Sequence, residues 1–212
     1  MSISEQQVQA ALKGAIDPNM KKDFVSAKTV RNIKIDGNNV AFDVVLPYPA
    51  KSVLGEIKAL AENAVKTIAG VGSVSANVSS KIVAHAVQRG VKPVPGVRNV
   101  IAVASGKGGV GKSTTAVNLA LALAAEGAKV GILDADIYGP SQPTMLGISG
   151  KPEASEDGQT LLPMMGHGLQ SMSIGFLIDV ETPMVWRGPM VTQALEQLLN
   201  QTKWDDLDYL VV

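Results

Sequence analysis

Cysteine is missing from all 212 residues of this sequence. Disulfides are therefore excluded within it, and so is any zinc or iron–sulfur site held by its own thiolates. Histidine is scarce as well, because only His85 and His167 are present, far apart in the chain. Neither has acidic or histidine neighbours at the spacing of metal ligands, so we expect no metal role for them.

An excess of charge and a long apolar run are also lacking. Lysine plus arginine and aspartate plus glutamate number 19 each, so no long-range field favours nucleic acid or an anionic membrane. No stretch approaches the roughly 20 apolar residues of a membrane-spanning helix. Residues 1–7 lack the basic and apolar segments of an export signal. We therefore expect a cytoplasmic protein that binds neither membrane nor nucleic acid.

The most informative segment that is present is GKGGVGKST at 106–114, which fits the phosphate-binding pattern GxxxxGK[ST]. An apolar run at 99–104 predicts a buried strand before it, and residues 113–125 predict a helix after it. In that context the glycines let backbone N–H groups surround anionic oxygens, and the helix adds its positive end. Lys112 can reach the β- and γ-phosphates of ATP, and the Ser113 hydroxyl can hold Mg²⁺. The predicted nucleotide-binding residues are Gly106, Lys107, Gly108, Gly109, Val110, Gly111, Lys112, Ser113 and Thr114.

Lys107 occupies a position that the general pattern leaves open. With this lysine the string resembles the deviant P-loop of the MinD/ParA/nitrogenase-iron-protein class of ATPases. The resemblance implies a homodimer in which Lys107 reaches the partner's nucleotide, where a cation offsets charge developing on the transferring phosphoryl group. The alternative is a solvated loop lysine. We assign Lys107 and Lys112 to catalysis.

Two aspartates follow the next expected strand, at 129–133. Asp134 and Asp136 would lie at the carboxyl edge of a parallel sheet, where nucleotide sites gather. A carboxylate there can orient the attacking water or hold Mg²⁺, although either aspartate could instead cap the next helix. By resemblance to the switch I segment of this class, Asp136 is assigned to water and Mg²⁺, with Ser113 as the other metal residue. Asp134 is expected to give structural support.

Four later strings narrow the family: GVKP at 90–93, DADIYGPS at 134–141, SIGF at 173–176 and WRGPM at 186–190. Together they resemble the Mrp/ApbC family of iron–sulfur cluster carrier ATPases, whereas MinD and ParA share only the P-loop. The resemblance implies a carrier that binds and hydrolyses ATP and assembles or transfers iron–sulfur clusters to apoproteins. Trp186 and Arg187 either contact the site or dimer seam, or form a packed aromatic with a surface base.

Two other functions stay open. The same P-loop would suit a MinD/ParA-type spatial-positioning ATPase, against which stand the balanced charge and the N-terminal region. A non-catalytic scaffold that keeps the fold without turnover is a third possibility. Loss of ATP turnover in Lys112→Ala would separate both enzymes from the scaffold.

Residues 1–82 predict a separate small α+β unit. A capping box formed by Ser4 and Gln7 starts a helix whose apolar face includes Ile16 and which stops at Pro18. Two strands, a long helix and a third strand follow, at 29–35, 40–46, 53–68 and 74–78.

This unit resembles the MIP-type iron–sulfur assembly domain through IDP at 16–18, DFVS at 23–26 and LPYPA at 46–50. Many such domains carry a cysteine in the last segment, where this chain has Lys51 and Ser52. We therefore expect a docking or dimer-supporting role for the unit, without redox or ligand chemistry.

The remaining residues divide into a linker at 83–98, rich in glycine, proline and basic groups, and an ATPase domain at 99–212. The expected fold class is α/β, a P-loop NTPase with a doubly wound parallel sheet, preceded by the α+β domain. In the family the strand at 207–212 leads to a Mg²⁺-binding aspartate and, later, to a Cys-Pro-x-Cys pair that holds a bridging cluster in the dimer. We therefore expect an N-terminal piece of a longer protein, with a truncated sheet, poor stability alone and little ATPase activity by itself.

Overall fold

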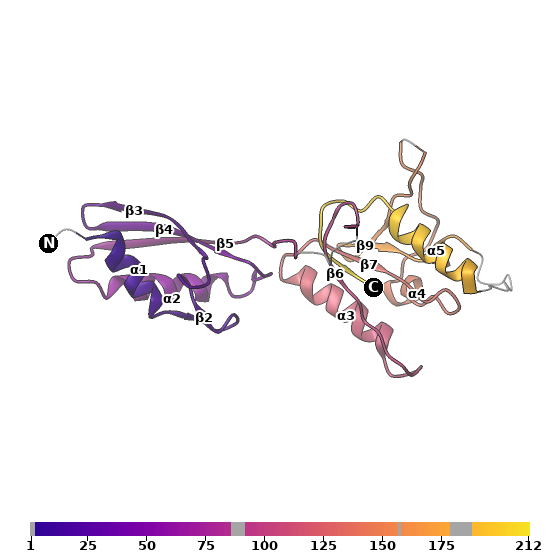
Figure 1. The fold of residues 1–212 in the computed structure, drawn as a ribbon, viewed down its shortest axis with the longest axis horizontal. Helices are drawn as coiled ribbons and strands as arrows, with labels where there is room; N and C mark the ends of the chain where they lie inside the picture. Colours follow the sequence, from indigo (N-terminus) through magenta and orange to yellow (C-terminus); the bar gives the residue numbers. More distant parts are fainter. Residues whose placement is uncertain (1–2, 86–91, 157, 179–187) are drawn as a thin grey trace. The chain divides into compact units, whose positions relative to one another are not determined.

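The computed structural model describes residues 3–85, 92–156, 158–178 and 188–212. It divides into two compact units, Met1–Ile82 and Val83–Val212, and Figure 1 shows the elements of each. Residues 90–91 of the GVKP string, and Trp186 and Arg187, lie outside the described residues, so the roles expected for this pair stay predictions.

The first unit is an α+β module. Its elements are α1 (Glu5–Lys13), β1 (Ile16–Asp17), β2 (Lys22–Asp23), β3 (Val30–Asp36), β4 (Asn39–Leu46), α2 (Leu54–Lys66) and β5 (Ser73–Ser80). The three longer strands form a sheet in the order β3-β4-β5, in which β4 pairs antiparallel with β3 and parallel with β5. The parallel pair is possible because α2 returns the chain to the starting edge.

Both helices of this unit pack on one face of its sheet. Alternate residues of β4 are buried and join a core that includes Leu12 of α1 and Ile57 of α2. The expected apolar stripe of the second helix is buried at Ile57, Ala61 and Val65. The two-layer arrangement follows from the period-2 pattern of β4 meeting the helical stripes.

The start of the chain departs from the expectation at Ile16. The capping box of Ser4 and Gln7 is present, but α1 ends at Lys13 with Gly14 as its C-cap. Ile16 is consequently not on the helix; it lies in β1 and is 51% exposed. The short β1–β2 ribbon, which pairs Asp17 with Lys22, was not anticipated.

The second unit contains the P-loop. Its elements are β6 (Val97–Ile101), α3 (Lys112–Ala125), β7 (Val130–Leu133), α4 (Gln142–Leu146), β8 (Met164–Gly166), β9 (Leu169–Met172), the 3₁₀ helix η1 (Ile174–Phe176), α5 (Gly188–Asn200) and β10 (Leu207–Val211). The sheet order is β6-β10-β7-β9-β8. The first four strands are parallel, and β8 pairs antiparallel with β9 at the edge.

Helices cover both faces of this sheet, which confirms the predicted doubly wound α/β class. Val130 and Ile132 of β7 pack in one core with Ala120 of α3. Leu133, on the opposite face of the same strand, packs in another core with Leu198 of α5. Because both faces are buried, β7 is apolar at every position that carries a side chain.

Part of the stretch expected as a linker lies against β6 in the second unit. The Asn99 side-chain nitrogen donates to the Val83 carbonyl at 3.2 Å, and the His85 backbone nitrogen donates to the Asn99 Oδ1 at 3.0 Å. β6 itself begins at Val97, two residues before the expected strand at 99–104.

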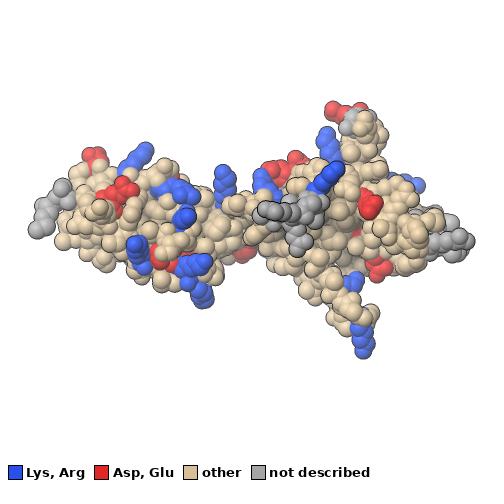
Figure 2. Space-filling model, viewed as in Figure 1, with Lys and Arg blue, Asp and Glu red and all other residues tan. Residues whose placement is uncertain are grey.

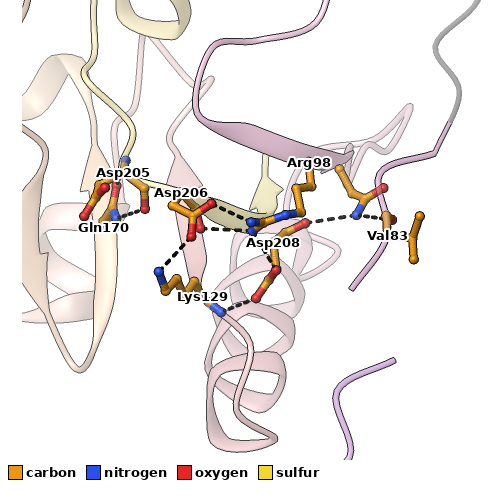
Figure 3. A network of polar contacts seen from close by, with 8 residues as sticks. Val83, Arg98, Lys129, Gln170, Asp205, Asp206 and Asp208 are labelled. Carbon is orange, nitrogen blue, oxygen red and sulfur yellow. Dashed lines mark hydrogen bonds and ion pairs between the residues drawn. The ribbon is translucent and has the colours of Figure 1, made fainter. Parts of the chain in front are cut away.

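An ion-pair network holds the amino ends of three strands together (Figure 3). Arg98, which belongs to β6, bonds both Asp206 and Asp208, and Lys129 Nζ lies 2.9 Å from Asp206 Oδ2. The Lys129 backbone nitrogen also donates to Asp208 Oδ2 at 2.9 Å. The network fixes β10 between β6 and β7 at the edge opposite their carboxyl ends, which leaves the carboxyl edge for a ligand site.

Candidate nucleotide-binding site

The loop between β6 and α3 has the backbone that its glycines require. Gly109 and Gly111 have φ of 75° and 87°, in the left-handed region that side chains disfavour. A Cβ built at Gly106, Gly108, Gly109 or Gly111 meets no neighbouring atom within 4 Å. The backbone of the loop is therefore open to a ligand on these sides, as a phosphate cradle must be.

The helix that follows begins at the residues expected to contact phosphate. Gly111 is the N-cap of α3 and Lys112 is its first residue. The first N–H groups of an α-helix have no partner within the helix, so they can donate hydrogen bonds to an anion that lies before its first turn. Lys112 and Ser113 are half-buried, whereas Thr114 and Lys107 are exposed. Ser105 Oγ donates to the Lys107 carbonyl at 2.9 Å and so fixes the start of the loop.

A cavity of about 380 Å³ joins this loop to the carboxyl edge of β7. It brings together Lys112, Ser113 and Asp136. The lining residues are Ala102, Val103, Ala104, Ser105, Lys112, Ser113, Ala116, Ile132, Leu133, Asp134, Ala135, Asp136, Ile137, Tyr138, Gln142, Val191 and Val212. Lys107 is described but is not in this lining, and the same holds for Thr114 and residues 106, 108–111 of the loop.

Asp134 is buried, and its carboxylate accepts hydrogen bonds from the loop that follows it. Its Oδ1 accepts from the Asp136 backbone N–H at 3.1 Å. Its Oδ2 accepts from the Ser141 and Gln142 N–H groups at 2.9 and 3.0 Å and from the Ser173 hydroxyl at 3.2 Å. The Asp134 carboxylate thus holds the loop in place and links it to Ser173, the residue that follows β9. These donors offset the cost of burying the carboxyl group away from water.

Asp136 differs from Asp134 in being exposed at the mouth of the cavity. Its Oδ1 accepts from the Gly139 N–H at 3.0 Å, which holds the side chain beside the loop. The hydrogen bonds of Asp134 shape the loop, and Asp136 presents a carboxylate to the cavity. Carboxylate, Ser113 hydroxyl and water oxygens are the ligands that Mg²⁺ prefers.

Two members of this site were not singled out from the sequence. Ser173 was noticed only as part of a family string, although it follows β9, whose carboxyl end meets that of β7. Gln142 was not noticed at all; it is 4% exposed and lines the cavity. The strand order, which the sequence does not show, places Ser173 beside Asp134. Gln142 is the first residue of α4, after a segment with glycine and proline, and no sequence pattern there indicates its burial.

A second hollow of about 290 Å³ lies beside α5. Its lining includes Leu161, Leu177, Met190, Gln193 and Gln197, and none of the lining residues is charged. A triphosphate requires cations and oriented N–H groups, so this hollow is unsuited to the phosphates of a nucleotide.

Within the described ranges, no three His, Asp or Glu residues gather as a metal-binding group. His167 lies 3.0 Å from the Leu146 carbonyl, and His85 contacts Asn99. On the face shown in Figure 2, acidic and basic side chains are interspersed over each unit. None of the helices in the described part of the chain is long and apolar enough to span a membrane.

Comparison with known proteins identifies both units. Residues 96–212 match the family described as "NUBPL iron-transfer P-loop NTPase", and residues 5–78 match "Iron-sulfur cluster assembly protein". The "Iron-sulfur cluster carrier protein" of Synechocystis is 45% identical over 208 residues, which are 97% of this chain and 59% of the relative. The protein of that name from Escherichia coli K12 is 46% identical over 195 residues, 92% of this chain and 53% of the relative.

A mammalian relative supports the same assignment. The mouse "Iron-sulfur cluster transfer protein NUBPL" is 58% identical over 123 residues, 57% of this chain and 38% of the relative. The chain thus spans between about half and three-fifths of the length of the two bacterial relatives. The resemblance noted from the P-loop and the later strings is confirmed, and the chain belongs to the family of NUBPL iron-transfer P-loop NTPases.

Proposed function

We propose that this chain supplies the nucleotide-binding and ATP-hydrolysing part of an iron–sulfur cluster carrier. One observation carries the proposal: Lys112, Ser113 and Asp136 line one cavity at the carboxyl edge of β7, in a chain of the iron-transfer NTPase family. The relatives named as cluster carriers favour this function over spatial positioning. The use of ATP favours a cytoplasmic location.

The residues of the site divide the work of holding Mg²⁺ and ATP. The backbone of 106–111 and the first N–H groups of α3 would surround the phosphates, and Lys112 would bind the β- and γ-phosphates. Ser113 and Asp136 would hold Mg²⁺, which offsets phosphate charge when bound. The open space beside the glycines and the oxygen donors of the cavity fit both groups. Asp136 would also orient the water that attacks the γ-phosphate.

Lys107 is assigned a role in a homodimer. Because it is exposed and is not in the cavity lining, its amine is available to a second subunit. From there it would place a positive charge on the partner's γ-phosphate during hydrolysis.

The iron–sulfur cluster is cargo in this proposal. The 212 residues contain no cysteine, so the thiolates that hold a cluster are not among them. ATP binding and hydrolysis would switch the dimer between two arrangements and thereby control cluster loading onto, or release to, an apoprotein.

The proposal is tested by steady-state ATP turnover of the intact full-length protein and of its Lys112→Ala variant. Turnover is expected to fall by about a hundredfold or more, because one cation is removed from the transferring phosphoryl group. Lys151→Ala, at an exposed lysine of the same unit, is the control and should keep the wild-type rate. Equal rates for the two alanine variants would overturn the assignment of Lys112, whereas an absence of turnover in the wild-type protein would support the scaffold alternative.

Two further measurements address the dimer and the cargo. Lys107→Glu should lower turnover while leaving the affinity for ATP nearly unchanged, since its contact is made in trans. For the cargo, the intact full-length protein, reconstituted anaerobically with iron and sulfide, should develop visible absorbance and pass its cluster to an apoferredoxin. Turnover stimulated by DNA or by anionic vesicles, without cluster transfer, would favour the positioning ATPase.

A further inference from the structure

We propose that Gln142 is a water-positioning residue of this nucleotide site: its side-chain carbonyl accepts a hydrogen bond from the water that attacks the γ-phosphate. The inference rests on the proposed function and adds a residue to it. Its basis is a buried acceptor that lacks a partner at the wall of the cavity.

The Gln142 side chain is buried but unsatisfied. The residue is 4% exposed, and its Oε1 has no hydrogen-bond partner in the described part of the protein. Buried carbonyl oxygens in native proteins nearly always have a partner, and an exception calls for a water or ligand. Because Gln142 lines the cavity, a molecule held there can supply the missing donor.

The backbone of Gln142 is fixed by the same carboxylate that shapes the site. Its N–H donates to Asp134 Oδ2 at 3.0 Å, and it is the first residue of α4. Asp134 also accepts from the Asp136 N–H, so the two residues that face the cavity share one anchor. An amide anchored in this way is already ordered before ligand binds, which a positioning residue requires.

The chemistry of the Gln142 side-chain carbonyl indicates that its hydrogen-bond donor is a water molecule and not a phosphate. A carbonyl oxygen carries no proton, and neither do the phosphate oxygens of ATP that would point toward it, so direct contact between them is unfavourable. A water molecule donates to Gln142 with one proton while its own oxygen faces the γ-phosphorus. Gln142 takes no proton in this role. The water oxygen bonds to phosphorus, the bond to the bridging oxygen of ADP breaks, and the released proton passes to the phosphate product.

The matched substitution is Gln142→Met, which keeps the length and volume of the side chain but removes the amide. Gln197→Met, in the uncharged hollow beside α5, is the control for the same change elsewhere in the unit. We expect kcat of Gln142→Met to fall by about tenfold to a hundredfold while the Kd for Mg·ATP changes by less than about threefold. The control should keep both values.

A second readout separates positioning from a structural role. In the presence of Mg²⁺, ADP and aluminium fluoride bind together as a mimic of the transferring phosphoryl group with its attacking water. Gln142→Met should weaken this mimic about tenfold and leave ADP alone unaffected. Its melting temperature should equal or exceed that of the wild type, because an unpaired buried carbonyl has been removed.

Three results would overturn the inference: wild-type kcat in Gln142→Met, equal weakening of ADP and the mimic, or a loss of turnover that follows a lowered melting temperature. Failure of the proposed function itself is recognised differently, because the intact full-length wild-type protein would then show no ATP turnover at all.

Discussion

Each unit of the protein contains a buried aspartate whose carboxylate accepts hydrogen bonds from the backbone of the loop that follows it. In the first unit Asp17 is fully buried and accepts from the N–H groups of Asn19 and Met20, at 2.8 and 3.1 Å, and from the Tyr48 hydroxyl at 2.8 Å. In the second unit Asp134 accepts from three backbone N–H groups and from a serine hydroxyl. Both carboxylates therefore hold a loop in place.

The surroundings of the two aspartates differ in one respect. Tyr48 closes the remaining side of Asp17. Asp134 instead lines a cavity together with Lys112 and Gln142, and the Oε1 of Gln142 has no hydrogen-bond partner among the described residues. A buried carboxylate with a full set of donors is thus not by itself a functional group. What marks the second unit as the ligand-binding one is the cavity beside its aspartate and the acceptor left without a partner.

Removing the charge at the two positions should give the largest effects, and they should differ in kind. Asp134→Asn places an amide N–H₂ against backbone N–H donors, so the second unit should lose about 3 kcal/mol of stability. Mg·ATP binding should weaken as well, because the loop of Asp136 and Gln142 loses its anchor. Urea unfolding followed by tryptophan fluorescence measures the stability, since both tryptophans belong to this unit.

The matched change Asp17→Asn should destabilise only the first unit, by about 2 kcal/mol. Hydrogen exchange of the amides of β4 measures it, and Mg·ATP affinity should stay at the wild-type value. A loss of nucleotide affinity in Asp17→Asn equal to that in Asp134→Asn would contradict the distinction between the two units.

A smaller effect is expected at Tyr48. Burial of the phenol raises the pKa of Tyr48 to about 12, with its hydrogen bond to Asp17 acting in the same direction. Because the folded state favours the neutral form, this stabilisation is complete below about pH 10, the pKa of an unfolded tyrosine, and is lost as pH rises toward 12. Tyr48→Phe should cost about 1–2 kcal/mol at pH 7.

The test for Tyr48 is the dependence of first-unit stability on pH. The difference between wild type and Tyr48→Phe should shrink between about pH 10 and 12. A difference that stays constant over this range would show that the hydroxyl does not stabilise Asp17.

The smallest effect is expected in the exposed network of Figure 3. The hydrogen bond that Asp206 accepts from Lys129, together with the positive charge of Arg98, lowers the pKa of Asp206 below its usual value. Stability from this carboxylate is present above the unfolded-state pKa of about 4 and is lost as pH falls through the lower folded-state pKa. The small gap in stability between wild type and Asp206→Asn should therefore close in acid, and acid unfolding curves measure it. A gap that widens as pH falls would contradict this sign.

The local parts of this structure could be predicted from the sequence. The strand, glycine loop and helix around 106–114 depend on residues close together in the chain, and α2 follows from an apolar stripe along its length. The P-loop string also indicated the class of ATPase, and the later strings indicated the family. Local propensity and spacing suffice where each residue's environment is set by near neighbours.

The rest depended on contacts between distant residues. The β1–β2 ribbon and β8 are too short to show a pattern of alternation. The bond from Ser173 to Asp134 requires β9 to lie beside β7, and strand order is not visible in the spacing of the sequence. Sequence reasoning therefore identified Lys112, Ser113 and Asp136 of the cavity lining but not Gln142.

The central claim is that the open loop at 106–111 and the carboxyl edge of β7 together bind Mg·ATP. Isothermal titration of the protein with Mg·ATP tests it most directly. The account predicts a saturable signal with one site per chain, which is lost in Lys112→Ala and retained in Asp17→Asn. An absence of heat with the wild-type protein, or an unchanged isotherm in Lys112→Ala, would contradict it.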